Sequence, residues 1–438
     1  MSRKNNPSHS FEQARHDMAD AIRAYQPSPG VFRVEIRIKP IDQLAWLSAQ
    51  NAQVKIFGAD QEDNAAIAGV GEAVALSGNG KVDFTKVFAR LRRYLNPAYP
   101  YLQWYGGFCF DAAAGDGPWS PLGSWRFILP RFELARYKDK MIFCCNLTAA
   151  DKAGALKELA VLKPPSPGKG LKLNVRLRRD HPTPQAWRKG VEAVLKDIKA
   201  GRCQKVVLAR RTDLVFKEKL DPWTMLKTLK KVTPRSYHFA FGLGDTVFLG
   251  ASPERLYKRH GRVIISEALA GTKAASVAPG VLLRSAKDRH EHQLVVEAIA
   301  DGLGPLCDQL VFDPKPRIRT LSNGHHLNTR FQGHLKDGVK DEDVLQSLHP
   351  TPAVGGVPRD FARRCIRRSE SFDRGWYAGP LGYVGLDWAE FVVGIRSGLI
   401  KGKELSVFAG AGIVQGSRAG DEWREIENKI GNFIKIIK

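Results

Sequence analysis

Strand-like and helix-like segments interleave along the whole chain. Residues 31–38, VFRVEIRI, alternate apolar and polar side chains, as a half-buried strand does. Thr183 and Pro184 form a helix start, and apolar residues continue at helical spacing until Gly201. Further strands are predicted at 205–214, 247–251, 262–266, 390–396 and 404–409, and further helices at 285–303 and 420–437. This order is typical of a mixed α/β protein with large layered sheets.

One segment, KPPSPGKG at 163–170, has the composition of a linker. It divides the chain into an N-terminal half, 1–170, and a larger region, 171–438. The sequence does not decide whether the first residues of the N-terminal half are ordered or disordered. A chain of 438 residues can hold several domains of about 150 residues or one large α/β fold. We interpret the two parts as structural halves that meet at this linker.

The chain is strongly basic, with 68 lysine and arginine residues, 45 aspartate and glutamate residues and a formal net charge of +23. Such an excess makes nucleic acid, an anionic membrane surface and small anionic substrates candidate partners. The cations are dispersed in short groups, such as those at 176–179 and 363–368, and no RNA-binding signature occurs. No stretch approaches the ~18 apolar residues of a membrane span. A basic nucleic-acid-binding protein is therefore the less favoured alternative, and no membrane partner is expected.

The cysteine pattern and the N-terminus indicate a cytoplasmic protein. The six cysteines form no CxxC pair and no quartet at metal-binding spacing, which favours reduced, buried thiols. The first twenty residues lack the apolar core of a signal peptide, and they contain too many acidic residues for a transit peptide.

Two acidic pairs are spaced for joint action. Asp288 and Glu291 lie three residues apart on one predicted helix, and Glu422 and Glu425 do so on another. This spacing places both carboxylates of a pair on one helix face. Converging carboxylates from two helices would make the all-oxygen site that Mg²⁺ prefers. Spacing alone favours a simpler interpretation, in which Glu425 and Lys429 form a surface salt bridge and acids early in a helix favour its dipole.

Other single motifs are weaker. The glycine-rich segment 408–414, FAGAGIV, leaves a predicted strand and could cradle a carboxylate or phosphate, although a tight turn is the usual reason for such a sequence. Lys205 opens a strand; a solvated strand-end charge is the commoner interpretation, and a desolvated amine would be a usable base. Glu254 follows a turn at the end of a strand, where a surface turn residue is the simple interpretation. His290 and His292 point to different faces of a helix, so zinc is not expected.

Taken together, these segments resemble the chorismate-utilising enzyme family, and within it the isochorismate synthases. The motifs occur in family order over 205–429: KVVLAR, GASPERL, ALAGT, SAKDRHEH, LHPTPAVGGVP, FDRGWYAGPLGYVG, GIRSG, and FAGAGIV with EWREIENK. YGGFCFD at 105–111 resembles the N-terminal half of the family as well. The resemblance implies a single large chorismate-binding fold with layered, mostly antiparallel sheets flanked by helices.

The resemblance also implies an isomerase that uses Mg²⁺ to convert chorismate into isochorismate. Lys205 matches the general base that deprotonates water for attack at C2, and Glu254 matches the general acid that protonates the departing C4 hydroxyl. The metal would hold the ring carboxylate. Its matching ligands are Glu291 and Glu425, with Asp288 and Glu422 as supporting carboxylates. The positions that match substrate-binding residues are Gly271, His326, Ala353, Val354, Tyr377, Arg396, Gly410 and Lys429.

Within the family, the resemblance points to water as the nucleophile. Relatives that transfer ammonia carry a lysine in a PIKGT-like motif where this chain has Ala270, so no glutaminase subunit is expected. The HPTPAVGG segment resembles isochorismate synthases more than salicylate synthases, which remain the alternative inside the family. WYAGPLGY resembles the menaquinone-pathway type. Chorismate is the expected partner, nucleic acid is not, and the sequence indicates no oligomeric state.

Overall fold

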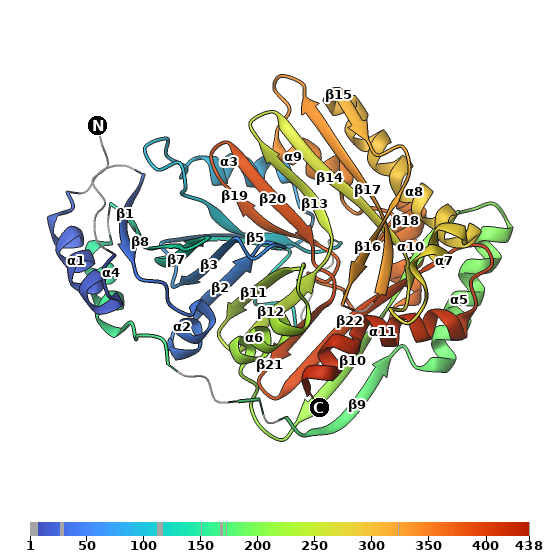
Figure 1. The fold of residues 1–438 in the computed structure, drawn as a ribbon, viewed down its shortest axis with the longest axis horizontal. Helices are drawn as coiled ribbons and strands as arrows, with labels where there is room; N and C mark the ends of the chain where they lie inside the picture. The colour runs from blue at the N-terminus through green and yellow to red at the C-terminus, as the bar shows by residue number, and fades with distance from the viewer. Residues whose placement is uncertain are drawn as a thin grey trace.

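The computed structural model describes residues 8–26, 30–111, 117–149, 151–166, 170–171, 173–322 and 324–437. Their strands form two large sheets flanked by helices, here called sheet A and sheet B (Figure 1). Both sheets contain strands from before and after the predicted linker, part of which lies outside the described residues. The predicted fold, with layered antiparallel sheets in one large unit, is therefore confirmed.

Sheet A holds twelve strands among the described residues. They are β1 Val31–Ile38, β2 Val54–Ala59, β3 Ala65–Val70, β7 Phe132–Tyr137, β8 Lys140–Thr148, β9 Val175–His181, β10 Lys205–Phe216, β11 Tyr237–Leu243, β12 Thr246–Ser252, β18 Gly356–Val357, β21 Ser397–Lys401 and β22 Glu404–Ile413. Their order is β1-β8-β7-β3-β2-β11-β12-β21-β22-β10-β18, with β9 also beside β10. The antiparallel register of β10 and β22 pairs Val207 with Gly412, which brings the first residues of β10 next to the glycine-rich end of β22.

Sheet B holds ten strands among the described residues. They are β4 Val74–Gly78, β5 Trp104–Phe108, β6 Trp125–Leu129, β13 Arg255–His260, β14 Val263–Lys273, β15 Cys307–Phe312, β16 Arg317–Leu321, β17 Gly324–Leu335, β19 Pro380–Val384 and β20 Trp388–Val393. Their order is β15-β17-β14-β13-β20-β19-β5-β6-β4, with β16 beside β17. At Gly106 and Gly107 of β5 the neighbouring strands approach the backbone closely, since added Cβ atoms would overlap them.

The chain crosses between the sheets twice at one place. It passes from β12 to β13 through Glu254 and returns from β20 to β21 through Arg396. The two crossings are hydrogen-bonded to each other: Val393 N–H donates to Glu254 O at 3.1 Å, and Ala251 N–H donates to Arg396 O at 3.1 Å. The fold therefore holds together the two backbone segments that carry an acid, Glu254, and a cation, Arg396, where the sheets join.

Helices cover both sheets (Figure 1). They are α1 Phe11–Ala24, α2 Gln43–Ala49, α3 Phe84–Arg92, α4 Lys152–Val161, α5 Pro184–Lys199, α6 Pro222–Val232, α7 Pro279–Arg284, α8 Ala286–Leu303, the short 3₁₀ helix η1 Gly304–Leu306, α9 Asp341–Leu348, α10 Arg359–Ser369 and α11 Ala419–Ile437. α8 packs against β14 and α11 packs against β22. In Figure 1 both helices lie at the end of the molecule opposite α1 and α4.

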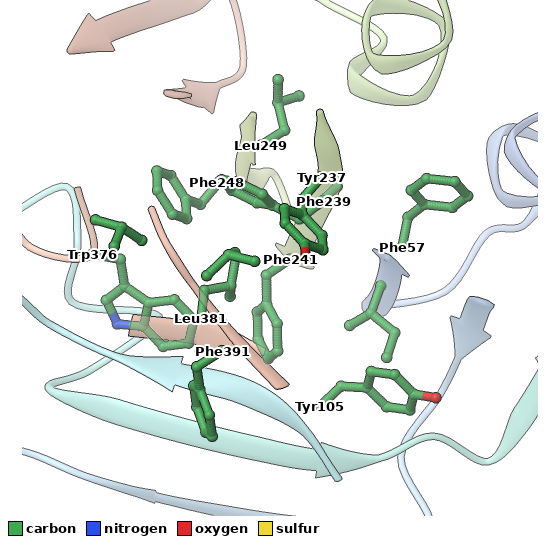
Figure 2. Close-up of a cluster of buried hydrophobic side chains, with 14 of the residues drawn as sticks. Phe57, Tyr105, Tyr237, Phe239, Phe241, Phe248, Leu249, Trp376, Leu381 and Phe391 are labelled. Atoms are coloured by element: carbon green, nitrogen blue, oxygen red, sulfur yellow. The ribbon is translucent and has the colours of Figure 1, made fainter. Parts of the chain in front are cut away.

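The main core lies between the two sheets. Figure 2 shows aromatic side chains from sheet A, such as Phe241 and Phe248, near Phe391 and Leu381 from sheet B. The rings of Phe241 and Trp376 have centroids 5.2 Å apart. Burial of such rings contributes roughly 1.5–3 kcal/mol each, so this layer fixes the relation of the sheets and, with it, the two crossings.

Three predicted strands ended clearly in the wrong place, and one of them, predicted at 262–266, continues to Lys273 as β14. The strand predicted at 390–396 ends at Val393, because the chain turns there towards sheet A and Arg396 takes a φ of 51°. The strand predicted at 404–409 continues to Ile413, so the glycine-rich segment is part of the sheet and not a turn beyond it. The glycines fit this position because β10 pairs with one edge of the segment while side chains of the site approach it closely.

The cysteine prediction is confirmed, since all six thiols are free and buried. Within the described part of the chain, no helix is long and apolar enough to cross a membrane.

Candidate active site

Lys205 is the first residue of β10, and its side chain is fully buried. It pairs with Val357 of β18, while the next residue pairs with β22, so strands hold it on both sides. Its Nζ lies 2.9 Å from Oε1 of Glu291. No described group forms an aligned hydrogen bond with this amine, so the contact is an ion pair and leaves donor positions open.

Glu254 is buried at the first crossing between the sheets. Its backbone is fixed on both sides, because its N–H donates to Ser252 Oγ at 3.2 Å and its carbonyl accepts from Val393. Burial first, and the carboxylate of Glu267 second, raise the pKa of Glu254 to about 8 against the opposing effect of two nearby lysines. The carboxyl is therefore mostly protonated at neutral pH and can donate a proton.

Four carboxylates come from the first two turns of α8 and α11, with the members of each pair one turn apart, as the spacing predicted. Each of them forms an ion pair with a different lysine. The pairs are Lys205–Glu291, Lys273–Asp288, Lys287–Glu422 and Lys429–Glu425, with N···O distances of 2.9, 2.7, 2.5 and 2.7 Å. The structure thus gathers the acids and balances their charge with side chains of its own.

The donor set of this cluster suits a hard cation, since it consists of carboxylate oxygens alone. Burial first, and the neighbouring Glu425 second, raise the pKa of Glu422, so further positive charge would relieve repulsion there. In the arrangement of the described residues, no three His, Cys, Asp or Glu side chains converge closely enough to hold a metal ion. The carboxylate oxygens are ligands of the type that Mg²⁺ prefers. In this structure their negative charges are balanced by the four lysines.

Arg396 and Lys429 bring positive charge to the same place. Burial lowers the pKa of Arg396 to about 10, which leaves the guanidinium charged at neutral pH. This guanidinium forms no ion pair with a described residue. Lys429 Nζ donates to Gly410 O at 2.7 Å and also pairs with Glu425. An anionic group of a ligand would therefore find here one half-buried cation that has no ion pair among the described residues.

His326 adds a neutral polar group. Its Nδ1 lies 3.1 Å from Thr272 Oγ1, while its buried Nε2 has no hydrogen-bond partner among the described residues. Burial first, followed by Arg396 and Lys429, lowers the pKa of His326 well below the usual value. The imidazole is therefore uncharged at neutral pH, with one nitrogen free for a ligand.

Glycines make room for these side chains. Gly271 has a φ of 71° at an irregularity in β14, and its Cα faces Asp288. A Cβ at Gly412 would overlap Oε1 of Glu291 and come within 2.9 Å of Lys205 Cε. The Lys205–Glu291 ion pair therefore requires glycine at position 412.

A pocket with an empty volume of about 640 Å³, part of it open to solvent, joins these groups. Most of the predicted site residues line it: Glu254, Gly271, Glu291, His326, Ala353, Val354, Tyr377, Arg396, Gly410, Glu425 and Lys429. Lys205, Asp288 and Glu422 do not line it. Lys205 contacts the lining carboxylate of Glu291, and the two acids lie one helical turn before lining carboxylates.

Sequence reasoning missed several lining residues: Val207, Pro253, Leu269, Ala270, Thr272, Ile395, Ala409 and Gly412. All lie inside or beside the motifs already noted. Val207 could have been found, because side chains two residues apart share a strand face with Lys205. Ile395 lacks such a signal, since its direction depends on the backbone turn near Arg396.

Comparison with known proteins places these observations in a family context. The sequence model of the family described as "Chorismate binding enzyme" matches residues 16–438. Isochorismate synthase MenF of Escherichia coli (strain K12) is 33% identical over 431 residues, covering 94% of this chain and 95% of that protein. The chloroplastic isochorismate synthase of Catharanthus roseus is 32% identical over 418 residues, 89% of this chain and 72% of that protein. The solved structure of the menaquinone-specific isochorismate synthase MenF from Escherichia coli matches with a TM-score of 0.89 at 30% identity, covering 98% of this chain and 100% of that chain.

Proposed function

The chain belongs to the chorismate-binding enzyme family, and on this basis we propose that it is an isochorismate synthase, an isomerase that converts chorismate into isochorismate. The observation that carries the proposal is a pocket lined by a protonated acid, Glu254, and by Arg396, a cation without an ion pair among the described residues. The buried amine of Lys205 reaches this pocket through its contact with the lining carboxylate of Glu291. The names and full-length matches of the relatives support it.

The proposed reaction moves a hydroxyl group between two carbons of the ring. A water oxygen forms a bond to C2 of chorismate while the amine of Lys205 takes a proton from that water. The ring double bonds shift and the C4–O bond breaks. Glu254 gives its proton to the departing oxygen, which leaves as water. Atoms balance, because one water enters and one leaves, and base and acid are separate groups with different protonation states.

Chorismate is a dicarboxylate, so binding it requires positive charge in the pocket. Arg396, just before β21, and Lys429, on α11, supply it, and the free Nε2 of His326 offers a neutral contact. Gly271 and Gly410 bring backbone close to the ligand space, with Ala353, Val354 and Tyr377 completing the wall.

We assign Glu291 and Glu425 as the residues that would hold Mg²⁺, with Asp288 and Glu422 as supporting carboxylates. A bound Mg²⁺ would supply positive charge to orient and neutralise the ring carboxylate. The chain's own contribution is the placement of these acids in the first two turns of α8 and α11.

The wall of the pocket favours water over ammonia as the nucleophile. Ala270 lines the pocket where an amine-bearing side chain would mark a relative that transfers ammonia. No glutaminase partner is needed for the proposed reaction. We further propose a cytoplasmic enzyme of the menaquinone pathway, which the free, buried cysteines and the similarity to MenF support.

Product analysis tests the proposal. Purified protein incubated with chorismate and Mg²⁺ is expected to form isochorismate, detected by chromatography against a standard. Accumulation of salicylate and pyruvate without persisting isochorismate would favour a salicylate synthase. Absence of conversion would contradict both assignments.

Glu425→Ala is expected to weaken the binding of Mg²⁺, because it removes a proposed ligand. The Mg²⁺ concentration for half-maximal rate should rise about tenfold or more, and calorimetry should show weaker Mg²⁺ binding. Asp421→Ala is the matched control, since Asp421 lies at the start of the same helix but pairs with Arg424 on the surface. An unchanged titration for Glu425→Ala removes this residue from the ligand set.

Gly412→Ala is expected to lower kcat about 10²-fold, the usual cost of misplacing a reacting group by about 1 Å. The added methyl group would displace Glu291 from Lys205. Gly431→Ala in α11 serves as the control, because a Cβ there meets open space. Wild-type kinetics in Gly412→Ala would show that this ion pair does not set the geometry of the reaction.

A further inference from the structure

Glu267 is a buried carboxylate that the proposed reaction does not use. We propose that Glu267, held by Arg319, fixes the segment that carries Glu254 and favours the protonated form of that acid by charge repulsion. Glu267 is therefore a positioning residue, and the inference rests on the proposed function of Glu254.

The first support is the way β13 begins. The backbone ladder between β13 and β14 covers only the far end of β13, from Lys258 to His260. At the near end, Glu267 Oε1 accepts from the N–H of Arg255 at 3.0 Å, and Ser266 Oγ donates to Leu256 O at 2.7 Å. Side chains of β14 thus replace the backbone ladder where the chain leaves Glu254.

The second support is the way Glu267 itself is held. Arg319 Nη1 lies 3.2 and 3.1 Å from the two carboxylate oxygens of Glu267. Asn328 Nδ2 lies 3.4 Å from Oε2. Neighbouring strands β16 and β17 therefore fix the carboxylate of Glu267 against the start of β13, through an ion pair with Arg319 and a contact with Asn328.

The third support is the balance of charge around Glu254. The groups that act on it are Glu267 from β14, Lys205 from β10 and Lys429 from α11. The groups that act on Glu267 are the side chains of Arg319 from β16, Asn328 from β17, Tyr237 from β11 and Arg255 from β13, together with the Arg255 N–H. Among the described groups that act on Glu254, Glu267 is the only anion. Its negative charge favours the protonated form of Glu254, whereas the two lysines favour the ionised form.

The test follows the proton on Glu254 directly. Infrared spectra would be recorded across pH, and the band of the protonated carboxyl would be assigned by its loss in Glu254→Gln. In the wild type its midpoint is expected near pH 8. Glu267→Gln, which keeps an oxygen acceptor for the Arg255 N–H, should lower the midpoint by about one pH unit. Arg319→Gln should raise it, because it removes the cation beside Glu267.

The control is Arg317→Gln, on the same strand as Arg319 but paired with Asp313 and largely exposed; its midpoint should equal that of the wild type. Opposite shifts in the two test variants support the inference, since a general loss of packing would not change sign. If Glu267→Gln does not fold, Arg319→Gln alone decides. Equal midpoints in wild type and variants overturn the inference.

Turnover gives the second readout. For Glu267→Gln, kcat should fall about fivefold at pH 8, change little at pH 6, and leave KM within about twofold, because fewer molecules carry the proton at high pH. An equal loss of kcat at both pH values would indicate a merely structural role. If the wild type forms no isochorismate, the proposed function fails, and the infrared midpoints still decide whether Glu267 acts on Glu254.

Discussion

Lys205→Ala is expected to reduce the rate of isochorismate formation about 10³-fold, within the range that general bases contribute. The variant lacks the amine that would take a proton from water, and it leaves the carboxylate of Glu291 without its partner at 2.9 Å. The measurement is kcat from the product assay, with circular dichroism and thermal unfolding to show that the sheets remain intact.

Lys205→Arg separates the two roles of this side chain. Arginine keeps a positive charge beside Glu291 but stays protonated at any working pH, so it cannot act as a base. We expect it to be nearly as inactive as the alanine variant. High activity of Lys205→Arg would mean that only the charge matters, and wild-type turnover of Lys205→Ala would refute the assignment of the base.

Glu254→Gln is expected to lower kcat about 10²- to 10³-fold, because an amide cannot give a proton to the departing C4 oxygen. Its side chain has nearly the same shape, so binding of chorismate should change little. The measurement is the separation of kcat from KM at pH 7.

The assignment of Glu254 as the acid also predicts how the wild-type rate changes with pH. The pKa of Glu254 is raised to about 8, chiefly by burial, so the acid carries its proton below that pH and loses it above. The wild-type rate should therefore fall as pH rises through about 8. The residual activity of Glu254→Gln should lack this fall, and Glu254→Asp should keep it. A high-pH fall that persists in Glu254→Gln would assign it to another group.

The sequence predicted which elements exist better than where they end. Periodicity located β10, α8 and α11, because strand alternation and helical spacing depend on neighbouring residues. It ended β22 too early, since glycine at 410 and 412 suggested a turn. In the structure these glycines lie opposite β10, and their lack of side chains makes room for Glu291 and Tyr377.

The site depended on resemblance more than on pattern. The spacing of Asp288 and Glu291 predicts a shared helix face, but not that the face meets Lys205 from a different strand. Such contacts arise from the packing of α8 on β14 and of α11 on β22, which no local pattern records. No sequence motif indicated a role for Glu267. Its proposed role depends on a tertiary feature, since β13 has no backbone pairing with β14 near Glu254 and Glu267 binds the Arg255 N–H instead.

The measurement that tests the central proposal most directly is oxygen labelling during one early phase of turnover. The protein would be incubated with chorismate and Mg²⁺ in water enriched in ¹⁸O, and isochorismate would be analysed by mass spectrometry before the reverse reaction redistributes the label. Water attack at C2 with loss of the C4 oxygen predicts one ¹⁸O atom in each isochorismate molecule, located in the C2 hydroxyl. Unlabelled isochorismate would show that the original hydroxyl migrates, and would contradict the roles given to Lys205 and Glu254.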